Sequence, residues 1–151
     1  MHILLWRVLA GVCLVIACQS AATTQQILTN AEVKELYKMA KQAYSVDMGG
    51  LDGAVFLRPG SCSSCLGSLK TALSNSTKTK LVIFVCGNYR FDLPSIASKT
   101  KKLVRDPWCS TDALSFAKPL SYLVIRKRAE RKYRLFIVEP STVNEIRSIV
   151  R

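Results

Sequence analysis

Residues 54–74 read AVFLRPGSCSSCLGSLKTALS, and this stretch decides the fold that the sequence predicts. Residues 54–57 are a short apolar run, which favours a β-strand. The turn at 58–61 contains proline and glycine, and residues 62–74 then place apolar side chains at helical spacing, with Ser61 available as the N-cap. The stretch therefore predicts a strand, a tight turn and a helix that begins with two cysteines three positions apart.

The rest of the chain supplies further helices and strands around this unit. Hydrophobic periodicity predicts helices over residues 31–44 (with Asn30 able to cap) and 142–151, and a helical excursion over 92–104. Residues 81–86, LVIFVC, are typical of a strand buried on both faces of a partly parallel sheet. Apolar runs at 120–125 and 133–138 flank a charged turn and predict a hairpin.

The resulting order of elements, α-β-α-β-α-β-β-α, resembles the thioredoxin fold. The resemblance covers residues 30–151 and includes the position of the Cys-Ser-Ser-Cys motif, between the first strand and the second helix. It also includes Pro119, which precedes the third strand at the place of the family's cis-proline. It implies an α/β domain with a central mixed β-sheet flanked by helices. Within the superfamily the chain looks most like exported bacterial lipoproteins of the thioredoxin-like class.

The resemblance implies thiol-disulfide exchange with protein or small-molecule thiols and disulfides. Cys62 is the expected nucleophile, because the unpaired N–H groups at a helix N-terminus favour a thiolate. Cys65 is the expected resolving cysteine. Pro119 would shape the substrate edge, and Arg58 and Lys118 would add positive potential beside the pair.

The motif departs from the thioredoxin pattern in ways that leave a second interpretation open. The tryptophan, glycine and proline of the usual Trp-Cys-Gly-Pro-Cys are missing, and Phe56 stands where thioredoxins carry a buried acid. A non-catalytic thioredoxin-fold binding module, in which Cys62 and Cys65 form a structural disulfide, is therefore the alternative.

The N-terminus predicts export. Residues 1–17 have a positive charge followed by a ten-residue apolar run, which suits a signal peptide and is too short to cross a membrane. The run ends in Val-Ile-Ala-Cys, which resembles the bacterial lipobox, so Cys18 is the expected lipidation site and residues 18–29 the tether. Two alternatives remain. An ordinary signal peptidase could cleave after Ala22, or the apolar run could be a buried strand or helix of the folded domain. The expected location is the cell envelope, with a lipid anchor in the inner or outer membrane.

Two further cysteines, Cys86 and Cys109, would remain in the mature domain. In an oxidising compartment they are candidates for a structural disulfide, while two free thiols or an accessory redox relay stay open. A zinc site at Cys62 and Cys65 lacks further ligands at suitable spacing, and the only histidine is His2. We therefore expect no metal, no cofactor and no histidine-based catalysis.

The chain of 151 residues is strongly basic, with 22 Lys and Arg against 10 Asp and Glu. Loss of residues 1–17 removes one charge, that of Arg7, from a net charge of +12. Two clusters of cations stand out: Lys99, Lys101, Lys102 and Arg105, and Arg126, Lys127, Arg128, Arg131, Lys132 and Arg134 at the hairpin. Export and the lack of interleaved aromatic residues argue against nucleic-acid binding. An anionic lipid or an acidic partner at the hairpin is the functional interpretation, and a solvated surface is the alternative.

Overall fold

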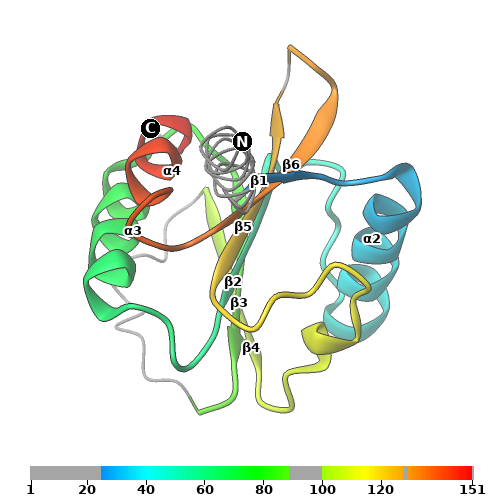
Figure 1. Ribbon diagram of the computed structural model, residues 1–151. Helices are drawn as coiled ribbons and strands as arrows, with labels where there is room; N and C mark the ends of the chain where they lie inside the picture. Colours follow the sequence, from blue (N-terminus) through cyan, green and yellow to red (C-terminus); the bar gives the residue numbers. More distant parts are fainter. Residues whose placement is uncertain (1–24, 89–99, 128, 151) are drawn as a thin grey trace, which may run out of the picture.

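A computed structural model describes residues 25–88, 100–127 and 129–150 as an α/β fold in three layers (Figure 1). The elements are β1 (Gln25–Ile27), α2 (Asn30–Tyr44), β2 (Gly53–Leu57), α3 (Ser63–Asn75), β3 (Leu81–Cys86), β4 (Lys101–Asp106), the 3-10 helix η1 (Ser110–Ala113), β5 (Tyr122–Lys127), β6 (Lys132–Ile137) and α4 (Val143–Ile149). Helices α3 and α4 cover one face of the sheet, and α2 lies on the other.

The mixed sheet has the strand order β1-β6-β5-β2-β3-β4. Strands β2, β3 and β4 are parallel, whereas β5 is antiparallel to β2 and the outer strands β6 and β1 continue the antiparallel pairing. The carboxyl ends of β2, β3 and β4 therefore share one edge of the sheet, at the bottom of Figure 1. The predicted class, a mixed sheet flanked by helices, is confirmed at this level.

Two apolar cores hold the layers together. Along β2, Val55 and Leu57 pack toward α3 and α4, while Ala54 and Phe56 pack on the side of α2, as the alternation of side chains in a strand requires. All six residues of β3 are buried, which confirms the prediction that residues 81–86 form a strand buried on both faces of the sheet. The side of α2 also contains stacked rings, with Phe56 between Phe84 and Tyr122.

Two segments differ from their predicted structure. The helical excursion predicted over 92–104 is wrong at its C-terminal end, because Lys101–Asp106 form β4 and pair in register with β3; residues 89–99 lie outside the described part. Gln25–Ile27, expected within the tether, form β1 against β6. In both cases a neighbouring strand supplies hydrogen bonds that local hydrophobic periodicity does not reveal.

Gly53 marks a close approach of backbones between β2 and β5. A Cβ atom at this position would collide with the carbonyl oxygen of Val124 and lie 2.9 Å from Cα of Ile125. We expect Gly53→Ala to lower the free energy of unfolding by about 2–3 kcal/mol, because neither backbone can yield without opening the pairing. Urea denaturation measures this, with Gly67→Ala on open surface of α3 as the control. The control should be neutral or stabilising by up to about 1 kcal/mol, and equal losses in both variants would contradict the prediction.

Within the described ranges, no helix is both long and apolar enough to cross a membrane. The predicted signal peptide, the lipidation site Cys18 and the start of the tether lie outside the described residues.

Candidate redox site at the carboxyl edge of the sheet

Cys62 and Cys65 are free thiols at the N-terminus of α3. Cys62 is itself the N-cap: the backbone N–H of Cys65 donates to its Sγ at 3.3 Å, and the Ser64 hydroxyl lies 3.1 Å from the same sulfur. Ser61, the predicted cap, is displaced from that role because its hydroxyl is bonded to Ser121. The helix end thus presents its unpaired donors to a sulfur atom instead of an oxygen.

The two thiols have opposite environments. Cys62 is partly exposed, whereas Cys65 is 3% exposed within the core shared by α3 and α4. Hydrogen bonds from the Cys65 thiol, the Ser64 hydroxyl and the Cys65 backbone lower the pKa of Cys62 to about 7. Burial, followed by the neighbouring Cys62 sulfur, raises the pKa of Cys65. An accessible thiolate beside a buried protonated thiol is the arrangement that stepwise disulfide exchange requires.

This asymmetry predicts the pH dependence of alkylation. In the reduced chain, we expect the labelling rate of Cys62 by iodoacetamide to rise with a midpoint near pH 7, because its thiolate forms as the pH passes the lowered pKa. Cys65 should stay largely unlabelled over the same range, since burial hinders access and its raised pKa keeps it protonated. Peptide mass spectrometry after timed labelling measures both rates. A midpoint near 9 for Cys62, the ordinary value for a thiol, would contradict the prediction.

The turn between β2 and Cys62 is fastened to the residue that precedes β5. Ser121 is fully buried, and its Oγ accepts a hydrogen bond from the backbone N–H of Arg58 at 2.8 Å. The hydroxyl of Ser61 lies 2.8 Å from the same oxygen, and the backbone N–H of Ser121 donates back to Ser61 Oγ, also at 2.8 Å. Both ends of the Arg58–Ser61 turn are therefore bonded to one residue, Ser121, directly before β5.

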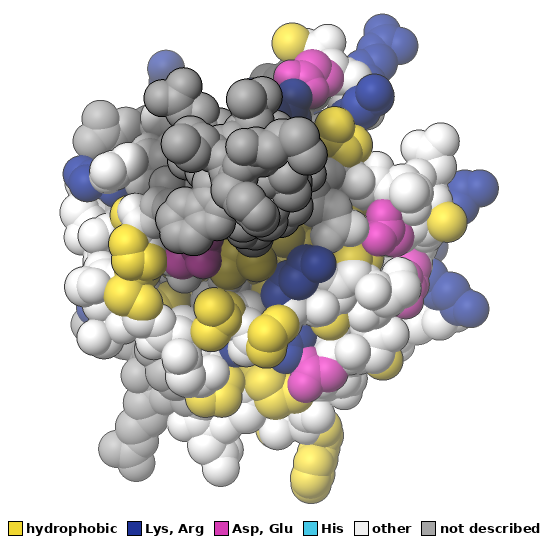
Figure 2. Space-filling view, in the orientation of Figure 1, with side chains coloured by type: hydrophobic (Ala, Val, Ile, Leu, Met, Phe, Trp, Pro, Cys, Tyr) yellow, Lys and Arg dark blue, Asp and Glu magenta, His cyan; other side chains and the backbone are white. Residues whose placement is uncertain are grey.

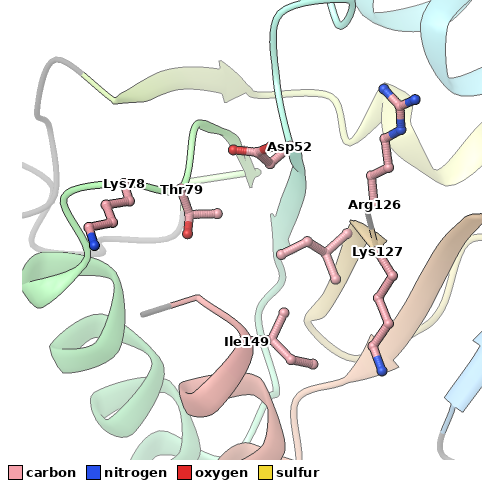
Figure 3. A pocket seen from close by; sticks show the side chains of 7 residues that line it. Asp52, Lys78, Thr79, Arg126, Lys127 and Ile149 are labelled. Carbon is pink, nitrogen blue, oxygen red and sulfur yellow. The ribbon is translucent and has the colours of Figure 1, made fainter. Parts of the chain in front are cut away.

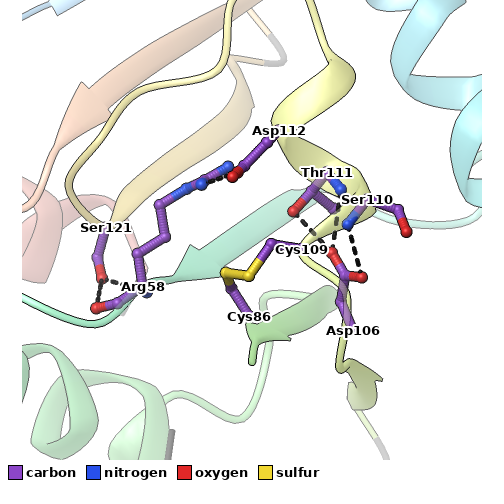
Figure 4. Close-up of a disulfide and its surroundings, with 8 residues drawn as sticks. All are labelled: Arg58, Cys86, Asp106, Cys109, Ser110, Thr111, Asp112 and Ser121. Atoms are coloured by element: carbon purple, nitrogen blue, oxygen red, sulfur yellow. Dashed lines mark hydrogen bonds and ion pairs between the residues drawn. A yellow bond between two sulfur atoms is a disulfide. The ribbon is translucent and has the colours of Figure 1, made fainter. Parts of the chain in front are cut away.

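Arg58 does not add its charge to the dithiol in the way the sequence predicts. Its side chain is buried and forms an ion pair with Asp112 of η1 (Figure 4). Its guanidinium carbon lies 5.5 Å from the centre of the Tyr122 ring. Its positive charge is thus already paired. The polar partners of Cys62 are Cys65 and Ser64.

The remaining predicted edge residues lie in the segment before β5. Lys118 is half-buried and Pro119 is exposed, two residues before Ser121. The cis-proline that the resemblance suggested is not found at Pro119, since every peptide bond of the described residues is trans.

Cys86 and Cys109 form a disulfide, with their Cα atoms 4.7 Å apart (Figure 4). This confirms the pairing predicted for them and removes the alternative of two free thiols. The bond joins the end of β3 to the segment that enters η1, so it lies on the same edge of the sheet as the Cys62 turn. Trp108, directly before Cys109, is 88% exposed on this edge.

A buried carboxylate completes this segment. Asp106 accepts hydrogen bonds from the backbone N–H groups of Ser110 and Thr111 and from the Thr111 hydroxyl, at 2.8 to 3.0 Å. Burial alone would raise the pKa of Asp106, but these hydrogen bonds outweigh it and hold the pKa below its usual value. Asp106 and the disulfide together fix η1, which presents Asp112 to Arg58. Sequence reasoning missed Asp106, Asp112 and Ser121, because no local motif marks them.

The opposite edge of the sheet carries a basic pocket of about 380 Å³ (Figure 3). Lys78, Arg126 and Lys127 contribute positive charge to its lining, Asp52 contributes one negative charge, and the rest is Thr79, Ile125 and Ile149. Figure 2 shows Lys and Arg side chains at the projecting β5–β6 turn beside this region.

Part of the basic character at the two clusters is neutralised or buried. Glu130 pairs with Arg134 at 2.5 Å and with Lys127 at 3.9 Å. Lys101, a member of the other cluster, is 5% exposed and donates to the Ser76 carbonyl and the Thr100 hydroxyl. Burial lowers the pKa of Lys101. Arg128 and Lys99 lie outside the described residues.

Comparison with protein-family models, curated proteins and solved structures gives no match. The described residues contain no cluster of three or more His, Cys, Asp or Glu side chains placed to hold a metal ion.

Proposed function

We propose that this chain is a thioredoxin-like thiol-disulfide exchange protein that acts through Cys62 and Cys65. The observation that carries the proposal is the pairing of a partly exposed Cys62 sulfur, held as the N-cap of α3 with a pKa of about 7, with a buried Cys65 whose pKa is raised. An inert pair needs neither an accessible sulfur nor a lowered pKa.

The topology supports the same interpretation. Parallel strands β2 and β3 joined by α3, and the later antiparallel β5–β6 hairpin followed by α4, agree with part of the order that the resemblance to thioredoxins implies. The strands β1 and β4 are additional to that order. The dithiol stands where β2 passes into α3. The trans bond at Pro119 departs from the family pattern, so recognition of substrate would not follow the family's proline-lined edge in detail.

The exchange is a two-step transfer of two electrons. The Cys62 thiolate attacks one sulfur of a substrate disulfide, which forms a mixed disulfide and releases the other substrate sulfur as a thiolate that takes a proton from water. Cys65 then loses its proton and attacks the Cys62 sulfur. The Cys62–Cys65 disulfide forms and the second substrate sulfur leaves as a thiol or thiolate. The same steps in reverse oxidise a substrate dithiol.

The reduction potential of the Cys62–Cys65 pair tests the proposal. The chain is equilibrated in graded glutathione and dithiothreitol buffers, free thiols are alkylated, and the peptides are quantified by mass spectrometry. This separates the Cys62–Cys65 pair from Cys86–Cys109 without substitution. A value between about −270 and −120 mV lies in the range of known exchange proteins, and a value below about −300 mV is typical of structural disulfides and would overturn the proposal.

A tethered binding module without redox activity is the second candidate, and the basic pocket favours it. Lys78, Arg126 and Lys127 face a cavity opposed by one carboxylate, which suits an acidic partner or an anionic lipid headgroup. The potential measurement separates the two candidates, because the module requires a stable Cys62–Cys65 disulfide.

Export and lipid anchoring are part of the same proposal. They rest on the signal-like residues 1–17 and on the lipobox-like sequence that ends at Cys18. The Cys86–Cys109 disulfide supports an oxidising compartment, since disulfides are rare in reducing ones. We propose a location at the cell envelope, anchored through Cys18.

A further inference from the structure

Ser121 forms a network of hydrogen bonds with the Arg58–Ser61 turn, which directly precedes Cys62. Ser121 Oγ accepts from the Arg58 N–H and from the Ser61 hydroxyl, each at 2.8 Å, and its own proton is aimed at the Arg58 carbonyl at 3.4 Å. Ser61 Oγ in turn accepts from the Ser121 N–H at 2.8 Å. Each hydroxyl proton is used once, so all four bonds can exist together.

The anchor itself is rigid. Ser121 is fully buried, and its backbone carbonyl accepts from the Val138 N–H at 2.8 Å, which ties it to the segment after β6. Arg58 and Ser61 are the two ends of the turn, and Cys62 follows Ser61 directly. A turn fixed at both ends to the sheet restricts the backbone angles available to the residue that follows it.

We propose that Ser121, acting through Ser61, is a positioning residue that holds Cys62 in its N-cap conformation for thiol-disulfide exchange. This inference rests on the proposed function of the Cys62–Cys65 pair. In the N-cap conformation the Cys62 sulfur faces the Cys65 N–H, whose donation favours the thiolate. Preorganised donors of this kind act only while the backbone keeps the sulfur in place.

The geometry also explains why Ser61 does not cap α3. A serine next to a helix start ordinarily offers its hydroxyl to the first N–H groups. Here that hydroxyl both donates to and accepts from Ser121, so the Cys62 sulfur caps the helix in its place. Ser61 and Ser121 thus determine which side chain receives the free N–H groups of the helix.

The test is the pH profile of Cys62 alkylation in the full reduced chain, read by peptide mass spectrometry. Ser61→Ala removes the two bonds made by the partly exposed Ser61 hydroxyl without leaving a buried cavity. Ser121→Ala removes the bonds of the buried Ser121 hydroxyl and keeps the Ser121 N–H donation to Ser61 Oγ. Ser61→Thr keeps the hydroxyl and serves as the rescue variant. Ser148→Ala is the matched control, because Ser148 is exposed on α4 and donates only locally, to the Glu145 carbonyl.

We expect midpoints near pH 7 for the wild type, Ser61→Thr and Ser148→Ala. The midpoints of Ser61→Ala and Ser121→Ala should rise by about half a pH unit or more, since each loses hydrogen bonds that hold the turn. The double variant should rise by less than the sum of the two single rises, because the bond between the two hydroxyl groups is already lost in each single variant. A merely structural role would lower the denaturation midpoint without moving this profile.

The results separate the two levels of inference. A midpoint near 7 in all variants would overturn the positioning role and leave the proposed function standing. A wild-type midpoint near 9 would overturn the proposed function, and with it the role of Ser121. A rise in Ser121→Ala without any rise in Ser61→Ala would also contradict the inference, since the effect would not pass through Ser61.

Discussion

We expect Cys62→Ser to abolish the proposed disulfide exchange and Cys65→Ser to capture the substrate as a mixed disulfide. The first variant loses the thiolate that attacks the substrate, and a serine hydroxyl at the N-cap of α3 cannot replace it. We expect a loss on the order of a thousandfold or more in the rate of reduction of a model disulfide. The N-cap itself survives, because serine is a strong capping residue, so the loss reflects chemistry and not the folding of the helix.

Cys65→Ser keeps the attacking sulfur and removes the resolving one. The mixed disulfide between Cys62 and substrate then has no buried thiol to displace it, and it accumulates. Mass spectrometry of the chain after incubation with oxidised glutathione measures this, as a stable adduct of one glutathione on Cys62. Equal adduct formation in Cys62→Ser and Cys65→Ser, or residual turnover in Cys62→Ser, would contradict the assignment of the two roles.

Much of the fold could be predicted because its central elements carry local signals. The six apolar residues of β3 and the turn residues before α3 are recognisable without knowledge of their partners. Strand β4, in contrast, could not be predicted from its own residues. They are mostly charged, and two of them, Lys101 and Asp106, are nonetheless buried. Their polar groups are hydrogen-bonded to residues outside the strand, Ser76 and Thr111. Only the pairing with β3 makes this segment a strand.

In the candidate site, too, the residues with a local sequence signal could be predicted and those positioned by long-range contacts could not. Cys62 and Cys65 are visible in the sequence, since a Cys-x-x-Cys pair at a helix start has a known chemical meaning. Ser121 lies 60 positions from Ser61, and Asp112 lies 54 from Arg58. No local pattern marks such contacts, because they arise from strand order and loop paths. The same reason hides the partner of Arg58, whose buried side chain forms an ion pair with the Asp112 carboxylate.

Removing the Cys86–Cys109 disulfide by substituting both cysteines with serine lowers the free energy of unfolding by about 3 kcal/mol. The two residues are separated by 23 positions, and cross-linking a loop of that length restricts the unfolded chain by roughly this amount. For a chain of this size, the loss corresponds to a fall of about 6–12 °C in Tm. Urea denaturation of the double variant measures the difference, with the m-value fitted for each protein because the unfolded chain is less compact without the cross-link.

Cys62→Ser alone is the matched control. Cys62 is a partly exposed thiol that is not bonded to another cysteine in the structure, so its loss removes no cross-link, and we expect a change below about 1 kcal/mol. A loss below about 1 kcal/mol for the Cys86 and Cys109 variant would instead mean that other contacts fix η1. Those contacts are the hydrogen bonds to Asp106 and the ion pair between Arg58 and Asp112, which would then hold the segment without the disulfide.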